Sequence, residues 1–321
     1  MKAPIAFVLF NRPDTTGRVF AEIRAAQPRE LFLIADGPRA NVPGDIERCA
    51  AARKIVEDVD WECEVRRNFS DINLGCGQRP ATGIDWVFEN VDRAIILEDD
   101  CVPHLTFFRF CDELLERYAE DERVMHVAGN NFQLGQRRGS YSYYFSRHNI
   151  CAGGWATWRR AWRHFDPEIT KWENLRSTPW LLDILAERRH VDHWMKIFDQ
   201  AHRDGKSADY WDYQWTFSFW TQSGLAAVPN VELLTNIGFS KDATHTRHAK
   251  DKWANVATAP MEFPLRHPPH MIPDGAADRF FLEQTSLNPP PKRRNKLDRV
   301  LGRLLGSPVA HSSQQRYDQQ N

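Results

Sequence analysis

Three consecutive acids, Glu98, Asp99 and Asp100, directly follow an apolar, β-branched run at residues 94–97. Such a run predicts a strand that is buried on both faces of a parallel sheet, and open α/β sheets bind ligands beyond the carboxyl ends of their strands. Because three adjacent carboxylates repel one another, we expect a positive group beside them. The alternative is a solvated strand end that happens to be acidic, and we favour a metal site.

Polar residues also follow the other predicted strands of the first half. Asn11 and Arg12 follow the first strand, Asp36 follows the second, and a loop containing Asn73 and Gly75 follows the third. Right-handed crossovers would bring all of these groups to one edge of the sheet. An arginine, an acid that accepts from a base, glycines and metal-binding carboxylates suit a nucleotide diphosphate with its divalent cation. The motifs G-x-G-x-x-G and G-x-x-x-x-G-K-[ST] do not occur where a dinucleotide site or a P-loop would need them.

The elements that must position these residues alternate along the chain. This alternation predicts an α/β fold with a mostly parallel sheet and helices on both of its faces. The strands are expected at residues 5–10, 31–35, 63–67, 94–97 and 124–128, and the helices at 15–26, 46–59, 82–90 and 104–118. In the second helix the apolar stripe runs through Ile46, Ala50, Ile55 and Val59.

The middle of the chain is rich in tryptophan, with nine of the twelve tryptophans at residues 140–222. Aromatic rings stack on sugars as well as filling cores, so this density hints at a carbohydrate site. Trp155, Trp158 and Trp162 recur at spacings of three and four, which predicts a helix stripe that belongs to the core. Asp212 lies among aromatic residues that would raise its basicity, or it caps the helix that follows.

Composition limits the classes of function. The chain has 321 residues, with 42 Lys and Arg against 43 Asp and Glu, so the formal net charge of -1 gives no basis for general nucleic-acid binding. No signal-peptide pattern and no long apolar span are present, so we expect a cytoplasmic protein, or one held peripherally at the inner face of a membrane. Six cysteines without C-x-x-C spacing indicate reduced thiols.

The acidic trio, the sequence Cys101-Val102-Pro103 after it, the aromatic helix at 107–110 and the pair Trp211-Asp212 resemble GT-A fold nucleotide-sugar glycosyltransferases. The pattern is most similar to the inverting β-1,2-N-acetylglucosaminyltransferase I type, and it is also similar to bacterial family-2-like glycosyltransferases. The resemblance covers about residues 4–245. It implies that Asp100 contacts Mn²⁺ or Mg²⁺, while Asp99 and Glu98 contact the ribose and the donor sugar.

The same resemblance implies roles for further residues. Asp212 would be the catalytic base, and a late histidine, His245, would return to the metal or the diphosphate unless it is an ordinary surface histidine. Trp211 and Trp215 are the candidates for acceptor contacts. The remaining candidates for nucleotide-sugar binding are Asn11, Arg12, Asp36, Gly75, Arg79, Gly154 and Trp155.

Together these features predict a metal-dependent inverting glycosyltransferase that moves a sugar from a nucleotide sugar, expected to be a UDP-sugar. The acceptor would be a hydroxyl of a glycan, a lipid-linked sugar or a protein, as in polysaccharide biosynthesis. One alternative is a sugar-1-phosphate nucleotidyltransferase, although residues 9–13 lack the glycine-rich loop that it would need. The other is a non-catalytic glycan-binding protein on the same fold, which the tryptophans favour.

We expect a nucleotide-sugar-binding half at 1–130, an acceptor-binding and catalytic half of the same domain at 131–288, and a basic, partly disordered tail at 289–321. In the tail, Leu297, Val300, Leu301, Leu304 and Leu305 form one helical stripe among basic residues. Such a helix suits an anionic membrane surface. It would equally suit docking on its own domain or on a second subunit.

Overall fold

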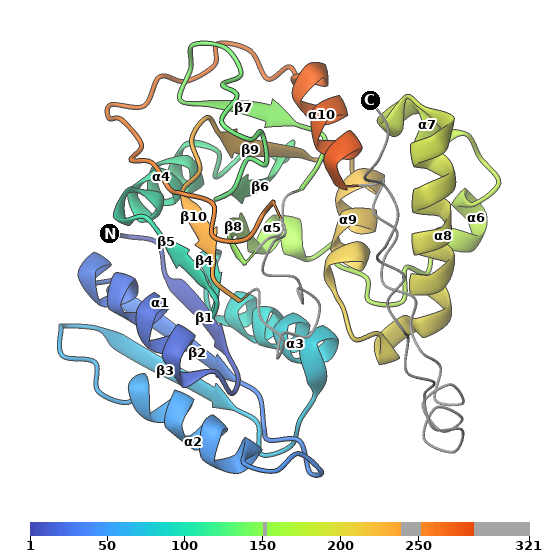
Figure 1. The fold of residues 1–321 in the computed structure, drawn as a ribbon. Coiled ribbons are helices and arrows are strands. Elements are labelled where there is room, and N and C mark those ends of the chain that lie inside the picture. Colours follow the sequence, from blue (N-terminus) through green and yellow to red (C-terminus); the bar gives the residue numbers. More distant parts are fainter. Residues whose placement is uncertain (150–152, 239–251, 286–321) are drawn as a thin grey trace, which may run out of the picture.

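The computed structural model describes residues 1–149, 153–238 and 252–285. Its centre is an eight-stranded sheet with the strand order β3-β2-β1-β4-β8-β6-β9-β7 (Figure 1). The strands are β1 (Ile5–Leu9), β2 (Glu30–Ala35), β3 (Glu64–Phe69), β4 (Arg93–Glu98), β6 (Val124–Ala128), β7 (Tyr143–Ser146), β8 (Gly154–Trp158) and β9 (Leu225–Pro229). A separate two-stranded sheet pairs β5 (Cys101–Pro103) with β10 (Leu234–Asn236).

The strand directions confirm the expected fold class. β3, β2, β1 and β4 are mutually parallel, while β8 runs antiparallel to both of its neighbours, β4 and β6. β6 and β9 are parallel to each other and therefore point the same way as β1 to β4, and β7 at the edge is antiparallel. The protein is thus an α/β domain with a mostly parallel central sheet. Strands from both sides of residue 130 build this one sheet.

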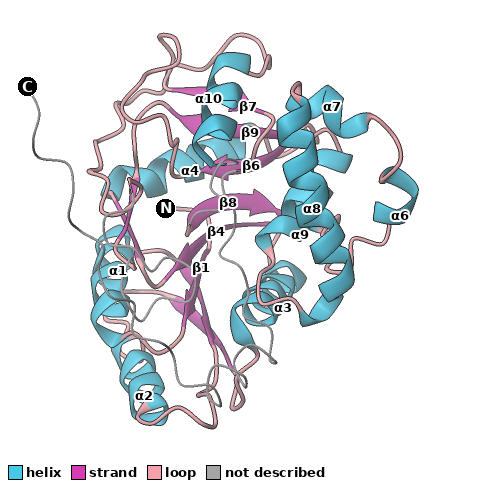
Figure 2. Cartoon of the chain, turned by 45° about the vertical axis from the view of Figure 1, so that its right-hand side comes forward, coloured by secondary structure: helices cyan, strands magenta, loops and turns pink. Residues whose placement is uncertain are grey.

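Helices cover both faces of the sheet (Figure 2). They are α1 (Pro13–Ala26), α2 (Asp45–Ile55), α3 (Gly75–Asn90), α4 (Leu105–Arg117), α5 (Arg159–Trp162), α6 (Trp172–Leu175), α7 (Trp180–Leu185), α8 (Arg188–Asp204), α9 (Asp212–Thr221) and α10 (Gly275–Thr285). Apolar residues of α1, α2 and α4 share one core cluster with the sheet, and those of α3 and α5 to α10 share the other.

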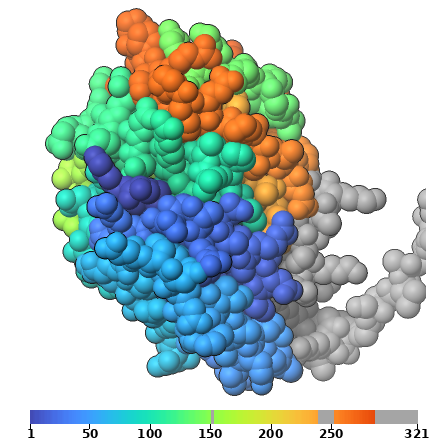
Figure 3. All heavy atoms as spheres, turned by 90° about the vertical axis from the view of Figure 1, so that its left-hand side faces the viewer, coloured from blue at the N-terminus to red at the C-terminus, as the bar shows by residue number. Residues whose placement is uncertain are grey.

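Side-chain alternation along the central strands explains this two-sided burial. In β1, Ile5 and Phe7 belong to the α1 side, whereas Ala6 belongs to the α3 side. Ile95 and Ile96 in β4 divide in the same way, because successive strand residues point to opposite faces. Figure 3 shows the outer α1 and α2 side, formed by the blue N-terminal residues, with α4 and the orange segment of residues 252–285 above them.

Three local predictions from the sequence are wrong. Trp155 and Trp158 lie in strand β8, not on a helix, and every residue of this strand is buried, so no polar alternation revealed it. The helix at 46–59 ends at Ile55 and buries Asp45, Cys49 and Ala52, while Ile46 is 69% exposed. Helix α3 begins at Gly75, seven residues before the predicted start at 82, and includes residues that were assigned to a loop.

Two predictions lie outside the described residues. These are the role of His245 and the amphipathic tail at 289–321. In the described part of the chain, none of the helices combines the length and the apolar character that crossing a bilayer requires. Contact of the tail with a membrane surface therefore stays a prediction.

Candidate active site

Arg12 supplies the positive group that the acidic trio requires. It follows β1 and precedes α1, and its Nη1 donates a 2.7 Å hydrogen bond to Oδ2 of Asp100. Its Nη2 donates to Oδ1 of Asp99, and the other oxygen of Asp99 accepts from the backbone N–H of Phe10 at 3.0 Å. The loop after β1 and the end of β4 are thereby joined, as the parallel pairing of these strands predicts.

The electrostatics of the trio follow from burial. Asp99 and Asp100 are 2% and 7% exposed. Burial raises the pKa of Asp99 to about 6, although the charge of Arg12 works in the opposite direction. Burial and the charge of Asp100 hold the pKa of Glu98 well above its usual range. Burial by itself would lower the pKa of Arg12. The negative charges of Asp99 and Asp100 outweigh this effect, so the pKa of Arg12 is raised.

Asp212 lies near this acidic group. It is the first residue of α9, after the N-cap residue Trp211, and it is half-buried. A carboxylate in the first turn is stabilised by the helix dipole. The charge of Asp212 contributes to the raised pKa of Glu98. The structure thus brings Arg12 into contact with the acidic trio, and the role of Asp212 as a base stays a prediction.

The start of α3 connects the two halves of this site. A Cβ at Gly77 would overlap the carbonyl oxygen of Ala208 and would lie 2.8 Å from the nitrogen of Tyr210, so only glycine permits this approach. The neighbouring Cys76 thiol donates to the carbonyl oxygen of Asp209 at 2.7 Å. Burial and the charge of Asp209 raise the pKa of Cys76 to about 11. The sequence analysis did not identify Cys76 or Gly77 as site residues, because a small residue at a predicted loop has no recognisable chemical pattern.

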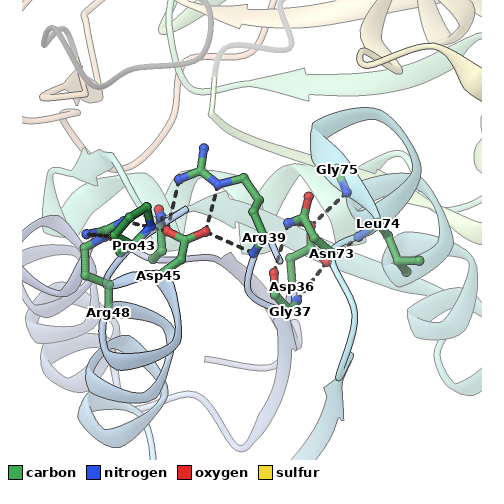
Figure 4. A network of polar contacts seen from close by, with 10 residues as sticks. Asp36, Gly37, Arg39, Pro43, Asp45, Arg48, Asn73, Leu74 and Gly75 are labelled. Atoms are coloured by element: carbon green, nitrogen blue, oxygen red, sulfur yellow. Dashed lines mark hydrogen bonds and ion pairs between the residues drawn. The ribbon is translucent and has the colours of Figure 1, made fainter. Parts of the chain in front are cut away.

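Asp36 is placed at the expected sheet edge, but its carboxylate is occupied by the chain itself (Figure 4). Its Oδ1 accepts from the backbone N–H groups of Gly37 at 2.9 Å and Leu74 at 2.8 Å. Its Oδ2 accepts from the amide of Asn73 and the N–H of Gly75, both at 2.9 Å. Asp36 therefore ties the end of β2 to the start of α3. Contact of Asp36 or Gly75 with a nucleotide stays a prediction.

A second buried carboxylate, Asp45, lies on the other side of the same loop (Figure 4). It is 0% exposed and accepts a 2.5 Å hydrogen bond from Nδ2 of Asn11. Arg39 and Arg48 also donate to it, and the hydrogen bond from Arg39 is the main cause that holds its pKa well below the usual range. The sequence analysis missed Asp45, because an acid in the first turn of a helix reads as an ordinary dipole contact.

The predicted aromatic contacts lie in the core. Trp155 and Trp215 are 0% exposed and Trp211 is 6% exposed. The ring of Trp155 stacks on that of Trp211 at 5.6 Å and lies 6.2 Å from that of Trp215. These rings are packed on one another, so the acceptor role of Trp211 and Trp215 and the donor role of Trp155 stay predictions that the geometry does not favour.

Gly154 and Arg79 are also engaged within the protein. A Cβ at Gly154 would lie 2.8 Å from Cδ2 of Leu234, so this glycine permits close packing against β10. Arg79 is buried, and its Nη2 donates to Oδ1 of Asn68 in β3 at 3.0 Å. Contact of Gly154 and Arg79 with a nucleotide sugar stays a prediction.

The sequence predicts that Asp100 holds a metal ion, and this stays a prediction. No group of three or more His, Cys, Asp or Glu side chains in the described residues is arranged to hold an ion. Mg²⁺ is commonly held by one or two carboxylates together with substrate phosphates, so a protein cage is not required. Asp100 is the candidate for such a role: its Oδ2 accepts from Arg12 and its Oδ1 from the thiol of Cys101 at 3.3 Å, and a carboxylate oxygen can accept more than one contact.

Comparison with known proteins gives limited information. No protein-family model and no curated protein matches the sequence. Among solved structures, the chain is similar to a UDP-glucose pyrophosphorylase complexed with UDP-glucose (10% identity, TM-score 0.31, 52% of this chain and 81% of that chain). It is also similar to mouse xyloside xylosyltransferase 1 in its apo form (11% identity, TM-score 0.31, 68% of this chain and 81% of that chain). At these TM-scores neither similarity bears on function.

Proposed function

We propose that this protein is a nucleotide-sugar glycosyltransferase. The observation that carries the proposal is the ion-paired cluster of Arg12, Asp99 and Asp100 at the carboxyl ends of β1 and β4. Glu98 ends β4 beside this cluster, and the charge of Asp212, the first residue of α9, contributes to the raised pKa of Glu98. This edge of an open α/β sheet is where ligands bind. The guanidinium of Arg12 suits a diphosphate, and the carboxylates beside it suit the hydroxyls of a sugar.

The residues divide the chemistry as follows. Arg12 binds the diphosphate, and Glu98 and Asp99 hold hydroxyls of the ribose and the donor sugar. Asp212 takes the proton from the acceptor hydroxyl as that oxygen attacks the anomeric carbon. The bond between this carbon and the diphosphate oxygen breaks, and the nucleoside diphosphate leaves with the electron pair. The acceptor oxygen attacks on the face opposite to the leaving group, which inverts the configuration at the anomeric carbon; this stereochemistry is the one that the resemblance implies.

A divalent cation, Mn²⁺ or Mg²⁺, is part of the proposal. Asp100 would hold it, and the ion would neutralise charge that develops on the departing diphosphate. We propose a UDP-sugar as the donor and a glycan, lipid-linked or protein hydroxyl as the acceptor, with a role in polysaccharide biosynthesis.

The experiment that tests this function uses the full chain and a panel of nucleotide sugars. Thermal unfolding is measured with each donor, with and without Mn²⁺, because a ligand that binds the native state raises its apparent stability. Donors that shift the transition are then tested for slow hydrolysis without acceptor. We expect one class of donor to stabilise the protein and to be hydrolysed when Mn²⁺ is present. If no nucleotide sugar changes the unfolding temperature, the proposal is wrong.

The alternatives give different results in the same assays. A nucleotidyltransferase would release pyrophosphate from a nucleoside triphosphate and a sugar 1-phosphate. A glycan-binding protein without activity would not hydrolyse any donor. The density of tryptophans favoured this alternative, but the tryptophans of β8 and α9 are buried in the two core clusters.

A further inference from the structure

The carboxylate of Asp45 joins three segments of the chain. It accepts from Asn11 after β1 at 2.5 Å, from Arg39 after β2, and from Nη2 of Arg48 in α2 at 2.7 Å. Arg39 contributes its backbone N–H at 3.0 Å, its Nε at 2.7 Å and its Nη2 at 3.0 Å. A fully buried carboxylate that accepts from five donors is held in one orientation by them.

This carboxylate fixes the guanidinium of Arg39 in one plane. The fork of Nε and Nη2 on Asp45 is bidentate, and the carbon of the guanidinium lies 5.3 Å from the centre of the Phe10 ring. The side chain of Arg39 is nevertheless 45% exposed. Its Nη1 has no hydrogen-bond partner among the described residues, and Figure 4 shows it directed away from Asp45. A donor that is held rigidly and left open is suited to binding a ligand.

The position of Arg39 points toward the candidate active site. Phe10, whose ring lies under the guanidinium, donates its backbone N–H to Asp99. Asn11, which shares Asp45 with Arg39, directly precedes Arg12. Arg39 therefore lies beside the same loop that supplies Arg12 to the acidic trio.

Arg48 provides a natural comparison within the same network. It donates to the same carboxylate and its side chain is 43% exposed, close to the value for Arg39. However, Arg48 belongs to α2, and its Nη1 is directed to the carbonyl oxygen of Pro43 at 3.4 Å. Both arginines therefore pair with Asp45 and are similarly exposed, but only Arg39 lies beside the loop after β1.

We propose that Arg39 is a further binding residue, whose guanidinium contacts the nucleoside diphosphate part of the donor, and that Asp45 is the residue that positions it. The inference rests on the proposed function. A nucleoside diphosphate offers anionic phosphate oxygens and base carbonyl oxygens, and both accept from a guanidinium. Asp45 itself has every oxygen engaged and does not touch the ligand.

The test is calorimetric titration of UDP, GDP, CDP, ADP and dTDP in turn into the full chain with Mn²⁺. The nucleotide that binds the wild type is then titrated into Arg39→Gln and Arg48→Gln. Arg39→Gln removes two side-chain hydrogen bonds to Asp45 and Arg48→Gln removes one, and each change removes one positive charge beside this carboxylate. Thermal unfolding of both variants is therefore measured alongside, so that a loss of affinity can be separated from a loss of stability. We expect Arg39→Gln to lower the affinity about tenfold, as for loss of a charged hydrogen bond, and Arg48→Gln to change it less than about twofold.

The positioning role has a separate readout. Asp45→Asn turns an amide toward the donors of Arg39 and Asn11, so it should lower nucleotide affinity through Arg39. In the double variant, Asp45→Asn should lower the affinity little beyond the effect of Arg39→Gln, because the arginine that Asp45 positions is absent. Should Asp45→Asn not fold, the two arginine variants still decide the binding role.

Two kinds of failure can be told apart. If the wild type binds none of the five nucleotides, the proposed function falls, and this inference falls with it. If the wild type binds one of them and the two arginine variants lose affinity equally or not at all, the inference is wrong while the proposed function stands.

Discussion

Gly238 lies directly against the carboxylate of Asp100. A Cβ at this position would fall 2.7 Å from Cγ of Asp100 and would overlap its Oδ2, so only a residue without a side chain permits the contact. The backbone N–H of Ile237 also donates to the carbonyl oxygen of Asp100 at 2.8 Å. The segment after β10 is thereby fitted onto the carboxylate that we propose for the metal.

Gly238→Ala should therefore displace this carboxylate or the segment that covers it. We expect Mn²⁺-dependent UDP affinity to fall about tenfold or more, measured by calorimetry. The matched control is Gly17→Ala in α1, where the nearest atom to an added Cβ is Cδ1 of Ile55 at 3.8 Å. That change should leave binding intact and should stabilise the helix by up to about 1 kcal/mol. Equal UDP affinity in both variants would argue against a tight fit at Asp100.

Asp100→Ala should abolish the Mn²⁺ dependence of UDP binding while the protein stays folded. Arg12 keeps its ion pair with Asp99 after this change, so no charge is left without a partner. The measurement is UDP affinity with Mn²⁺ and with a chelator, and circular dichroism reports on the fold. A variant whose affinity still rises on addition of Mn²⁺ would show that the ion is held elsewhere.

Much of this site could be predicted because its residues follow strands. Arg12 and the acidic trio each come directly after an apolar run, and the parallel order of β1 and β4 then brings them together. Asp45 could not be predicted in the same way. Its partners Asn11 and Arg39 are loop residues, and only the three-dimensional path of residues 36–45 places them around one buried carboxylate.

The helix predicted around Trp155 fails for a different physical reason. A strand that is buried on both faces carries no polar residues to reveal its period of two. Trp155 faces the α3 side and Trp158 the α1 side, so a spacing of three residues places them on opposite faces of β8. The same spacing in a helix would have placed them on one face, which is the interpretation that the sequence favoured.

Asp212→Asn should remove transfer but leave donor binding nearly unchanged. A general base acts in the transition state and contributes little to the affinity for the ground-state nucleotide. We expect the rate to fall about 100-fold or more, measured by release of UDP in the presence of acceptor. Asp209→Asn on the same segment is the control and should retain most of the activity. If the two results are reversed, Asp209 is the base.

Asp278 in α10 gives a prediction for the pH dependence of stability. It is 8% exposed, and burial raises its pKa to about 6, although Oγ of Ser146 donates to it at 2.6 Å. Below about pH 4 the residue is neutral in both states and contributes nothing. Between about pH 4 and 6 the unfolded chain ionises first, so the free energy of unfolding falls as pH rises, by up to about 3 kcal/mol.

Asp278→Asn should remove this loss, because the amide oxygen still accepts from Ser146 and no charge is buried. Relative to the wild type, the variant should gain stability between pH 4 and 6 and hold that gain at pH 7, measured by denaturant unfolding at each pH. His148 acts in the opposite direction, since burial lowers its pKa to about 3 and stability is lost as pH falls below 6.5. Both proteins retain His148, so its contribution cancels in the difference. A difference that does not change between pH 4 and 7 would mean that Asp278 is not buried as a neutral acid.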